Sequence, residues 1–171
     1  MRVGHLVRRF AGSLSPRPPP AAEARWAEDQ LLPGEVELWR ALSRADQRHV
    51  IGVARRVQAD LAGDATRPVL AAALLHDVGK LDAGLGTYGR VIATLSIAVA
   101  GRGSARAWAE TRGFTRKVGL YALHEELGAE RLSVAGSDPL TVALVREQSR
   151  PTEERTVPDR LVEALTAADD A

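Results

Sequence analysis

A histidine and an aspartate stand side by side at the end of a strongly apolar segment. His76 and Asp77 directly follow Leu74 and Leu75. A carboxylate is rarely buried unless it is paired or bound to a cation, so Asp77 needs a partner. Adjacent helical side chains point in different directions, but a cation beside the helix can be reached by both. The alternative is that Asp77 caps local backbone groups and His76 is a hydrogen-bonded core histidine.

Two more residues extend this pair into a candidate metal site. His49 lies on the inward stripe of the preceding predicted helix, and Asp169 follows an apolar stretch of the last one. Each has an ordinary structural explanation when it is taken alone. Together with His76 and Asp77, they supply two imidazoles and two carboxylates from three helices.

The composition restricts the chemistry further. The 171 residues include four histidines and no cysteine, which excludes disulfides, thiolate metal sites and thiol nucleophiles. A metal must therefore be held by histidine and carboxylate. The formal net charge is only +1, and aromatic residues make up 4% of the chain. We expect no nucleic-acid partner, because both the electrostatic field and the stacking surface are too small.

Residues 1–34 predict a basic, proline-rich N-terminal arm. Four prolines between positions 16 and 20 prevent a continuous helix, and a short helix is possible over about 21–32 before Pro33-Gly34. The Arg8-Arg9-Phe10 cluster is interpreted as a solvated or packed terminus, in preference to a membrane or nucleic-acid contact. No apolar signal region follows the basic start, so we expect a cytoplasmic protein.

Residues 35–171 are expected to form one all-α domain, an irregular helical bundle. Its first helix carries an apolar stripe from Leu38 to Leu61 that includes His49. A second helix opens near Pro68, is apolar nearly all round, and is ended by Gly79. Further helices are predicted near residues 90–100, 104–110, 114–122, 124–135, 139–148 and from 158. The uncharged run 91–100 is too short for a membrane span and predicts a buried helix.

The four candidate ligands resemble the pattern of the HD superfamily of metal-dependent phosphohydrolases. In that pattern a histidine is followed by a His-Asp pair and then by a distant aspartate, all on helices of an α-helical domain. The resemblance covers about residues 42–171. The matching segments are Arg48-His49, Leu74-Leu75-His76-Asp77-Val78-Gly79-Lys80 and Ala167-Ala168-Asp169.

The resemblance implies a divalent metal bound by His49, His76, Asp77 and Asp169. A mixed nitrogen and oxygen set without sulfur suits manganese, iron, cobalt, nickel or magnesium. Such an ion would activate a water molecule for attack on a phosphate ester, with Asp77 placed to orient or deprotonate that water. The implied substrates are nucleotides or other small phosphate esters.

Two other residues are implied in catalysis. Lys80 would neutralise a phosphate oxygen, although an ordinary surface lysine is the alternative. His124 lies in a segment that looks like the one where many superfamily members place a further histidine. There it binds a second metal or contacts the substrate; the alternative is a surface position at a helix N-terminus.

The sequence departs from the bimetallic members of the superfamily near Gln148. By our alignment, Arg146-Glu147-Gln148-Ser149-Arg150 stands where another histidine tends to follow. This favours a one-metal site, since a second ion would need Glu147 or Glu125 as a substitute ligand. It also leaves a rival hypothesis, a catalytically weak module that binds a nucleotide or a protein partner as a regulator. A third hypothesis is a helical bundle with purely structural histidines. The oligomeric state is left open.

Overall fold

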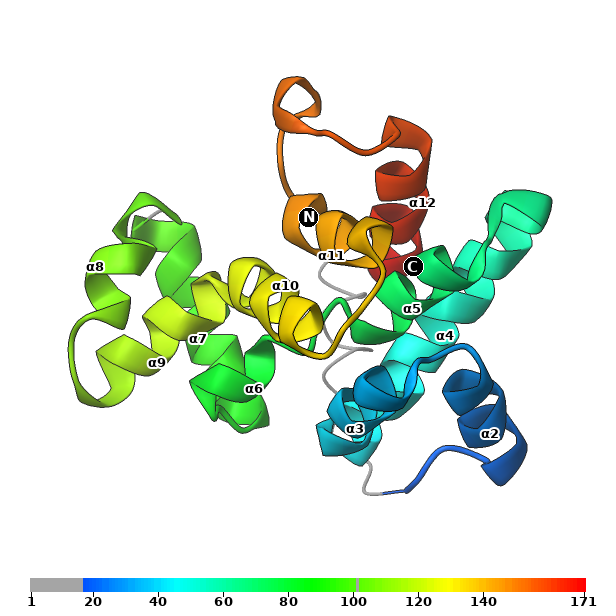
Figure 1. Cartoon of the computed structure of the whole chain (residues 1–171). Coiled ribbons are helices and arrows are strands. Elements are labelled where there is room, and N and C mark those ends of the chain that lie inside the picture. The colour runs from blue at the N-terminus through cyan, green and yellow to red at the C-terminus, as the bar shows by residue number, and fades with distance from the viewer. Residues whose placement is uncertain (1–16, 101) are drawn as a thin grey trace.

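The computed structural model describes residues 17–100 and 102–171, and all regular structure within these ranges is helical (Figure 1). This confirms the expected all-α fold. The α-helices are α2 (Ala21–Asp29), α3 (Pro33–Ala41), α4 (Arg44–Leu61), α5 (Arg67–Leu75), α6 (Lys80–Ala83), α7 (Thr87–Ala100), α8 (Ala105–Ala109), α9 (Gly113–Ala122), α10 (His124–Val134), α11 (Pro139–Glu147) and α12 (Asp159–Asp170). The first sixteen residues, with His5 and the Arg8-Arg9-Phe10 cluster, lie outside the described residues.

Helix α5 is the centre of the main core, as its apolar composition predicts. Every residue from Val69 to Leu75 is buried. Helices α4 and α11 pack against it, and α12 packs against α4. The Thr141 hydroxyl donates to the Pro68 carbonyl over 3.0 Å and joins the start of α11 to the start of α5. Figure 1 shows the end of α12 beside α4 near the middle of the molecule.

The apolar stripe from Leu38 to Leu61 predicts a single helix. This prediction is wrong, because the stripe is divided between α3 and α4. Helix α3 ends at Ala41, and Leu42 is extended, with φ −65° and ψ 149°. Ser43 then caps α4 by accepting a hydrogen bond from the Asp46 backbone N–H over 3.1 Å. A serine cap satisfies one of the free N–H groups of a new helix, which stabilises a break that apolar periodicity alone does not reveal.

The short helix expected over about 21–32 is α2, and it packs on α4. Ala27 and Leu31 belong to the main core. The Arg55 guanidinium lies 3.5 Å from the centre of the Trp26 ring and bonds the Glu23 carboxylate over 3.0 Å. Residues on both sides of position 34 therefore contribute to one core.

Helices α6, α7 and α9 surround a second, smaller apolar cluster. Its buried members are Ala83, Leu85, Ala93 and Val118. The expectation that residues 91–100 form a buried helix holds for only one side of α7. Ala93 is buried, but Val91, Ile92 and Leu95 are exposed. An unbroken apolar run predicts burial on every side, whereas α9 covers α7 on one side.

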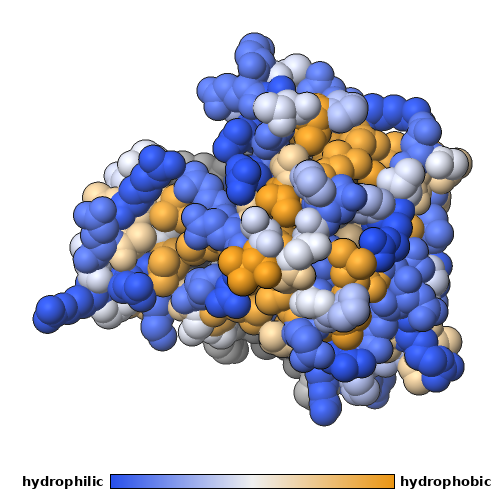
Figure 2. Space-filling view, in the orientation of Figure 1, coloured by the Kyte–Doolittle hydropathy of each residue, from blue (hydrophilic) through white to orange (hydrophobic). Residues whose placement is uncertain are grey.

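None of the helices in residues 17–100 and 102–171 combines the length and the hydropathy needed to cross a membrane. Figure 2 shows apolar residues reaching the surface over the middle of the face in view, with hydrophilic residues along most of its edge.

Candidate metal centre

His76 and Asp77 lie in a tight turn that directly follows α5. The turn is held by backbone hydrogen bonds of 3.0 Å from Val78 N–H to the Leu75 carbonyl and from Lys80 N–H to the Asp77 carbonyl. The two residues therefore stand just after the buried helix, not inside it as the sequence predicted. His76 is 1% exposed and Asp77 is 4% exposed. The turn directs both side chains into the interior at the end of the central helix.

The four predicted ligands converge at this turn. His49 Nε2 lies 2.8 Å from Asp169 Oδ1, and His76 Nε2 lies 3.6 Å from the same oxygen. His76 Nε2 is also 3.4 Å from Asp77 Oδ1. One ligand-type atom from each of His49, His76 and Asp77 lies within 4.8 Å of the others. Helix α4, the turn after α5 and helix α12 thus each supply part of the cluster, as the three-helix pattern predicts.

The His76 ring is oriented for coordination through Nε2. Its Nδ1 lies 3.0 Å from the Ala73 carbonyl. A carbonyl only accepts, so Nδ1 carries the proton and Nε2 carries the lone pair in the neutral ring. Nε2 is buried and has no hydrogen-bond partner among the described residues. A buried ring nitrogen beside two carboxylates, with its other nitrogen held by a carbonyl, fits a divalent cation.

The charges in the cluster also favour a cation. Burial alone would raise the pKa of Asp77, but Lys80, His76 and His124 lower it far below its usual value, so Asp77 is ionised. Burial would lower the pKa of His76, but Asp77 and Asp169 more than offset this and raise it. The two carboxylates therefore stabilise a positive charge at His76. A proton and a metal ion would compete for the position at Nε2.

Lys80 is part of this cluster and is not an ordinary surface lysine. Its Nζ lies 2.6 Å from Asp77 Oδ1, and its side chain is 13% exposed. Burial opposes the charge of Lys80, but Asp77 outweighs it and raises the pKa of the ammonium. The Tyr121 ring centre lies 5.7 Å from Nζ. A charged ammonium is thus held beside the ionised Asp77.

His124 is arranged in the same way as His76. Its Nδ1 donates to the Tyr121 carbonyl over 2.8 Å, again three residues earlier, and Nε2 is left as the acceptor. Burial, and then the nearby Lys80 charge, lower the pKa of His124, so the ring is neutral near pH 7. His124 also lowers the pKa of Asp77, so its ring lies close enough to the cluster to interact with it electrostatically. Tyr121, whose ring also lies beside His124 with centres 5.9 Å apart, was not predicted, because no sequence signal distinguishes it.

Gly79 allows the turn to approach α10 closely. Its φ of −66° is one that any residue adopts, so glycine is not required for its conformational freedom. A Cβ at this position would overlap the His124 carbonyl oxygen and lie 2.6 Å from the Gly128 backbone nitrogen. We expected Gly79 to end a helix; in the structure it brings the His-Asp turn against the start of α10.

The residues near Gln148 are occupied by structural contacts. The Gln148 side-chain amide lies 3.4 Å from the His76 carbonyl, and the Ser149 hydroxyl bonds the Glu125 carboxylate. Glu147 accepts from the Thr156 backbone N–H over 2.6 Å and from the Thr156 hydroxyl over 2.8 Å. Glu147 therefore holds the connection to α12 with both of its oxygens.

The last turn of α12, which carries Asp169, is held against α4. Arg56 Nε donates to the Ala168 carbonyl over 2.8 Å. Its neighbour Asp169 contacts His49 on the same helix α4. These two contacts oppose the fraying that is common in the last turn of a helix.

A partly buried ion pair that the sequence did not predict joins α7 to α4 beside the cluster. Arg90 donates to both Asp46 oxygens, over 2.6 and 3.0 Å, and to the Leu85 carbonyl over 3.2 Å. Asp46 precedes His49 by one helical turn. Arg90 is the charged residue directly before the uncharged run of α7. This position was the feature of the sequence that could have pointed to an ion pair at Arg90.

The Asp46–Arg90 pair predicts a pH-dependent stability. Burial alone would raise the pKa of Asp46, but the hydrogen bonds and charge of Arg90 lower it. Stability from such a group is present above the unfolded pKa of about 3.9 and is lost as the pH falls through the folded pKa. Below about pH 4, we expect the free energy of unfolding of the wild-type protein to fall more steeply with decreasing pH than that of Asp46→Asn. The two slopes should differ by up to about 1.4 kcal/mol per pH unit. Urea unfolding at a series of values from about pH 2.5 to about pH 6 measures both slopes, and equal slopes would contradict this assignment.

Comparisons of the chain with models of known protein families, with curated proteins and with solved structures yield no match.

Proposed function

We propose that the protein is a metal-dependent phosphohydrolase of the HD type, in which His49, His76, Asp77 and Asp169 bind one divalent ion. The observation that carries this proposal is the buried His76 Nε2, which lacks a hydrogen-bond partner in the described structure and faces the Asp77 and Asp169 carboxylates. A structural histidine of the core would be expected to have both ring nitrogens satisfied.

The bound ion would acidify a water molecule and screen the charge of the phosphate. The remaining roles belong to the chain itself. Asp77 is ionised and buried, so it can accept a hydrogen bond that orients the attacking water. The Lys80 ammonium opposes the charge of a phosphate oxygen. The neutral His124, whose Nδ1 is engaged by the Tyr121 carbonyl, would accept a hydrogen bond from the substrate through Nε2.

The proposed substrates are nucleotides or other small phosphate esters, and the proposed location is the cytoplasm. A single ion is proposed because the candidate ligands of a second one are occupied. Gln148 bonds a backbone carbonyl, Ser149 bonds Glu125, and Glu147 bonds Thr156.

Metal analysis of the purified chain, combined with a panel of phosphate esters assayed with manganese, cobalt, nickel or magnesium, tests the proposal. We expect one ion per chain and turnover of at least one ester. Two ions per chain would contradict the one-metal site. The absence of bound metal under every loading condition would overturn the proposal.

A regulatory binding module is the second candidate, and the engaged side chains of Gln148 and Ser149 favour it. This module would keep the metal and bind a nucleotide or a protein partner without efficient turnover. Bound metal and nucleotide binding, together with no hydrolysis across the whole panel, are the results expected for it.

A further inference from the structure

Helix α7 presents an apolar face to solvent. Val91 is 42% exposed, Ile92 is 51% exposed and Leu95 is 62% exposed, while Ala93 on the other side is buried. No charged residue occurs between Arg90 and Arg102. Adjacent exposed apolar side chains on a helical segment without charged residues mark a surface that is expected to be covered.

The N-terminal segment of the same chain has a complementary sequence. Its large apolar residues are Val3, Leu6, Val7 and Phe10, and these recur at the three- and four-residue steps typical of one face of a helix. Its cations, Arg2, Arg8 and Arg9, occupy positions between them. Such a segment can place apolar side chains on α7 and keep its charges in water.

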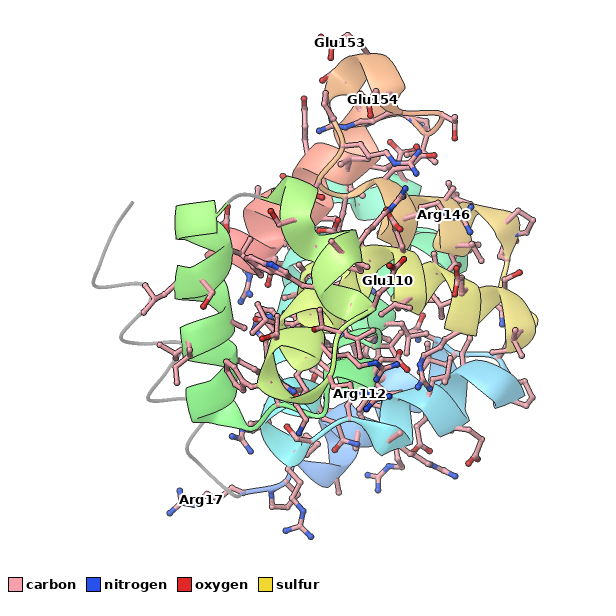
Figure 3. All side chains as sticks on the ribbon, turned by 90° about the vertical axis from the view of Figure 1, so that its left-hand side faces the viewer. Arg17, Glu110, Arg112, Arg146, Glu153 and Glu154 are labelled. Atoms are coloured by element: carbon pink, nitrogen blue, oxygen red, sulfur yellow. The ribbon has the colours of Figure 1, made fainter. Side chains whose placement is uncertain are left out.

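The described chain begins on the side of the molecule that carries α7. Figure 3 shows Arg17, where the described chain begins, on the same side of the molecule as α7. Residues 11–16 separate Phe10 from Arg17. The extended chain spans about 20 Å between Phe10 and Arg17, at roughly 3 Å per residue. Helix α7 itself is about 21 Å long, at 1.5 Å per residue.

We propose that residues 3–10 dock on α7 and cover Val91, Ile92 and Leu95. A second copy of the chain is a poorer occupant, because three side chains fall far short of the roughly 800 Å² per partner that a stable interface buries. An attached segment needs much less contact, since its effective concentration near α7 is high. Docking would also support the α7 turn from which Arg90 bonds Asp46.

Thiol protection tests this contact in the full-length chain, because the protein contains no cysteine. Leu95→Cys introduces a single thiol on the face, and its alkylation rate with iodoacetamide is measured. Val134→Cys, at a position that is 91% exposed on α10, is the control. We expect alkylation at position 95 to be at least about tenfold slower than at position 134, since a docked segment excludes the reagent.

The same measurement in Leu95→Cys with Leu6→Asp and Phe10→Asp identifies the occupant. We expect these changes to bring the rate to within about twofold of the control, because buried aspartates cannot replace the apolar contacts. Equal rates at positions 95 and 134 in the unchanged arm would overturn the proposal. Protection that persists with the two aspartates, or that grows with protein concentration, would also overturn it. Ile92→Cys repeats the test if Leu95→Cys does not fold.

Discussion

Asp77→Asn is expected to remove the bound divalent ion and to lower phosphate-ester turnover by about a thousandfold. Asparagine keeps the shape of Asp77 but removes the negative charge that faces His76 and Lys80. A neutral amide oxygen is a weaker metal ligand than a carboxylate and a weaker hydrogen-bond acceptor for water. Metal content after purification and kinetics with the best ester of the panel measure the two effects.

Asp82→Asn is the matched control for this change. Asp82 is also an ion-paired aspartate, bonded to Arg131 by two contacts of 2.7 Å, but it lies on α6 outside the cluster. We expect Asp82→Asn to retain metal and activity. If both variants lose metal equally, the assignment of Asp77 as a ligand is wrong.

A second variant separates loss of the site from loss of the fold. Asp77→Asn leaves Lys80 buried beside a neutral group, and an unpaired buried charge costs about 3 kcal/mol or more. Asp77→Asn combined with Lys80→Met removes both charges and should recover part of that stability. The double variant is still expected to bind no metal. Wild-type metal affinity in this folded variant would contradict the proposed centre.

Gly79→Ala is expected to destabilise the protein by about 3 kcal/mol, because an added Cβ would overlap backbone atoms at the start of α10. Neither the His124 carbonyl nor the Gly128 backbone nitrogen can move aside as a side chain would. The turn must then separate from α10, which carries His124 away from Asp77 and Lys80. We therefore expect lower turnover as well as a lower urea midpoint.

Gly86→Ala is the control for the glycine prediction. Nothing lies within 4 Å of a Cβ built at Gly86, and its φ is not positive. The change is expected to leave stability unaltered or to raise it by about 0.5 kcal/mol through a less flexible unfolded chain. Equal stabilities of the two alanine variants would show that the turn does not approach α10 as described.

Residue type and periodicity were sufficient to predict the helical class, and the resemblance to the HD pattern was needed to group the four side chains into one site. His49 lies on an inward stripe, and His76 and Asp77 end an apolar helix. Polar groups at such positions point into a core, where they need each other or a cation. The ligand role itself stays a prediction, as does the phosphohydrolase activity.

The features that the sequence did not reveal depend on contacts between segments distant in the chain. Ser43 splits the first predicted helix through a local cap, but the exposed face of α7 depends on which helices pack against it. Gly79 gave the signal of a helix end, whereas its close approach to His124 exists only in the folded chain.

The environment of the candidate site likewise comes from the tertiary structure. Lys80 and His124 differ from ordinary surface residues because α9 and α10 pack beside the His-Asp turn and cover most of their side chains near Asp77. Burial and neighbouring charge set the protonation of these groups, and neither is encoded in local periodicity. Local patterns thus identified the reactive residue types. Long-range packing decided the orientation of their side chains, their charge and their positions relative to one another.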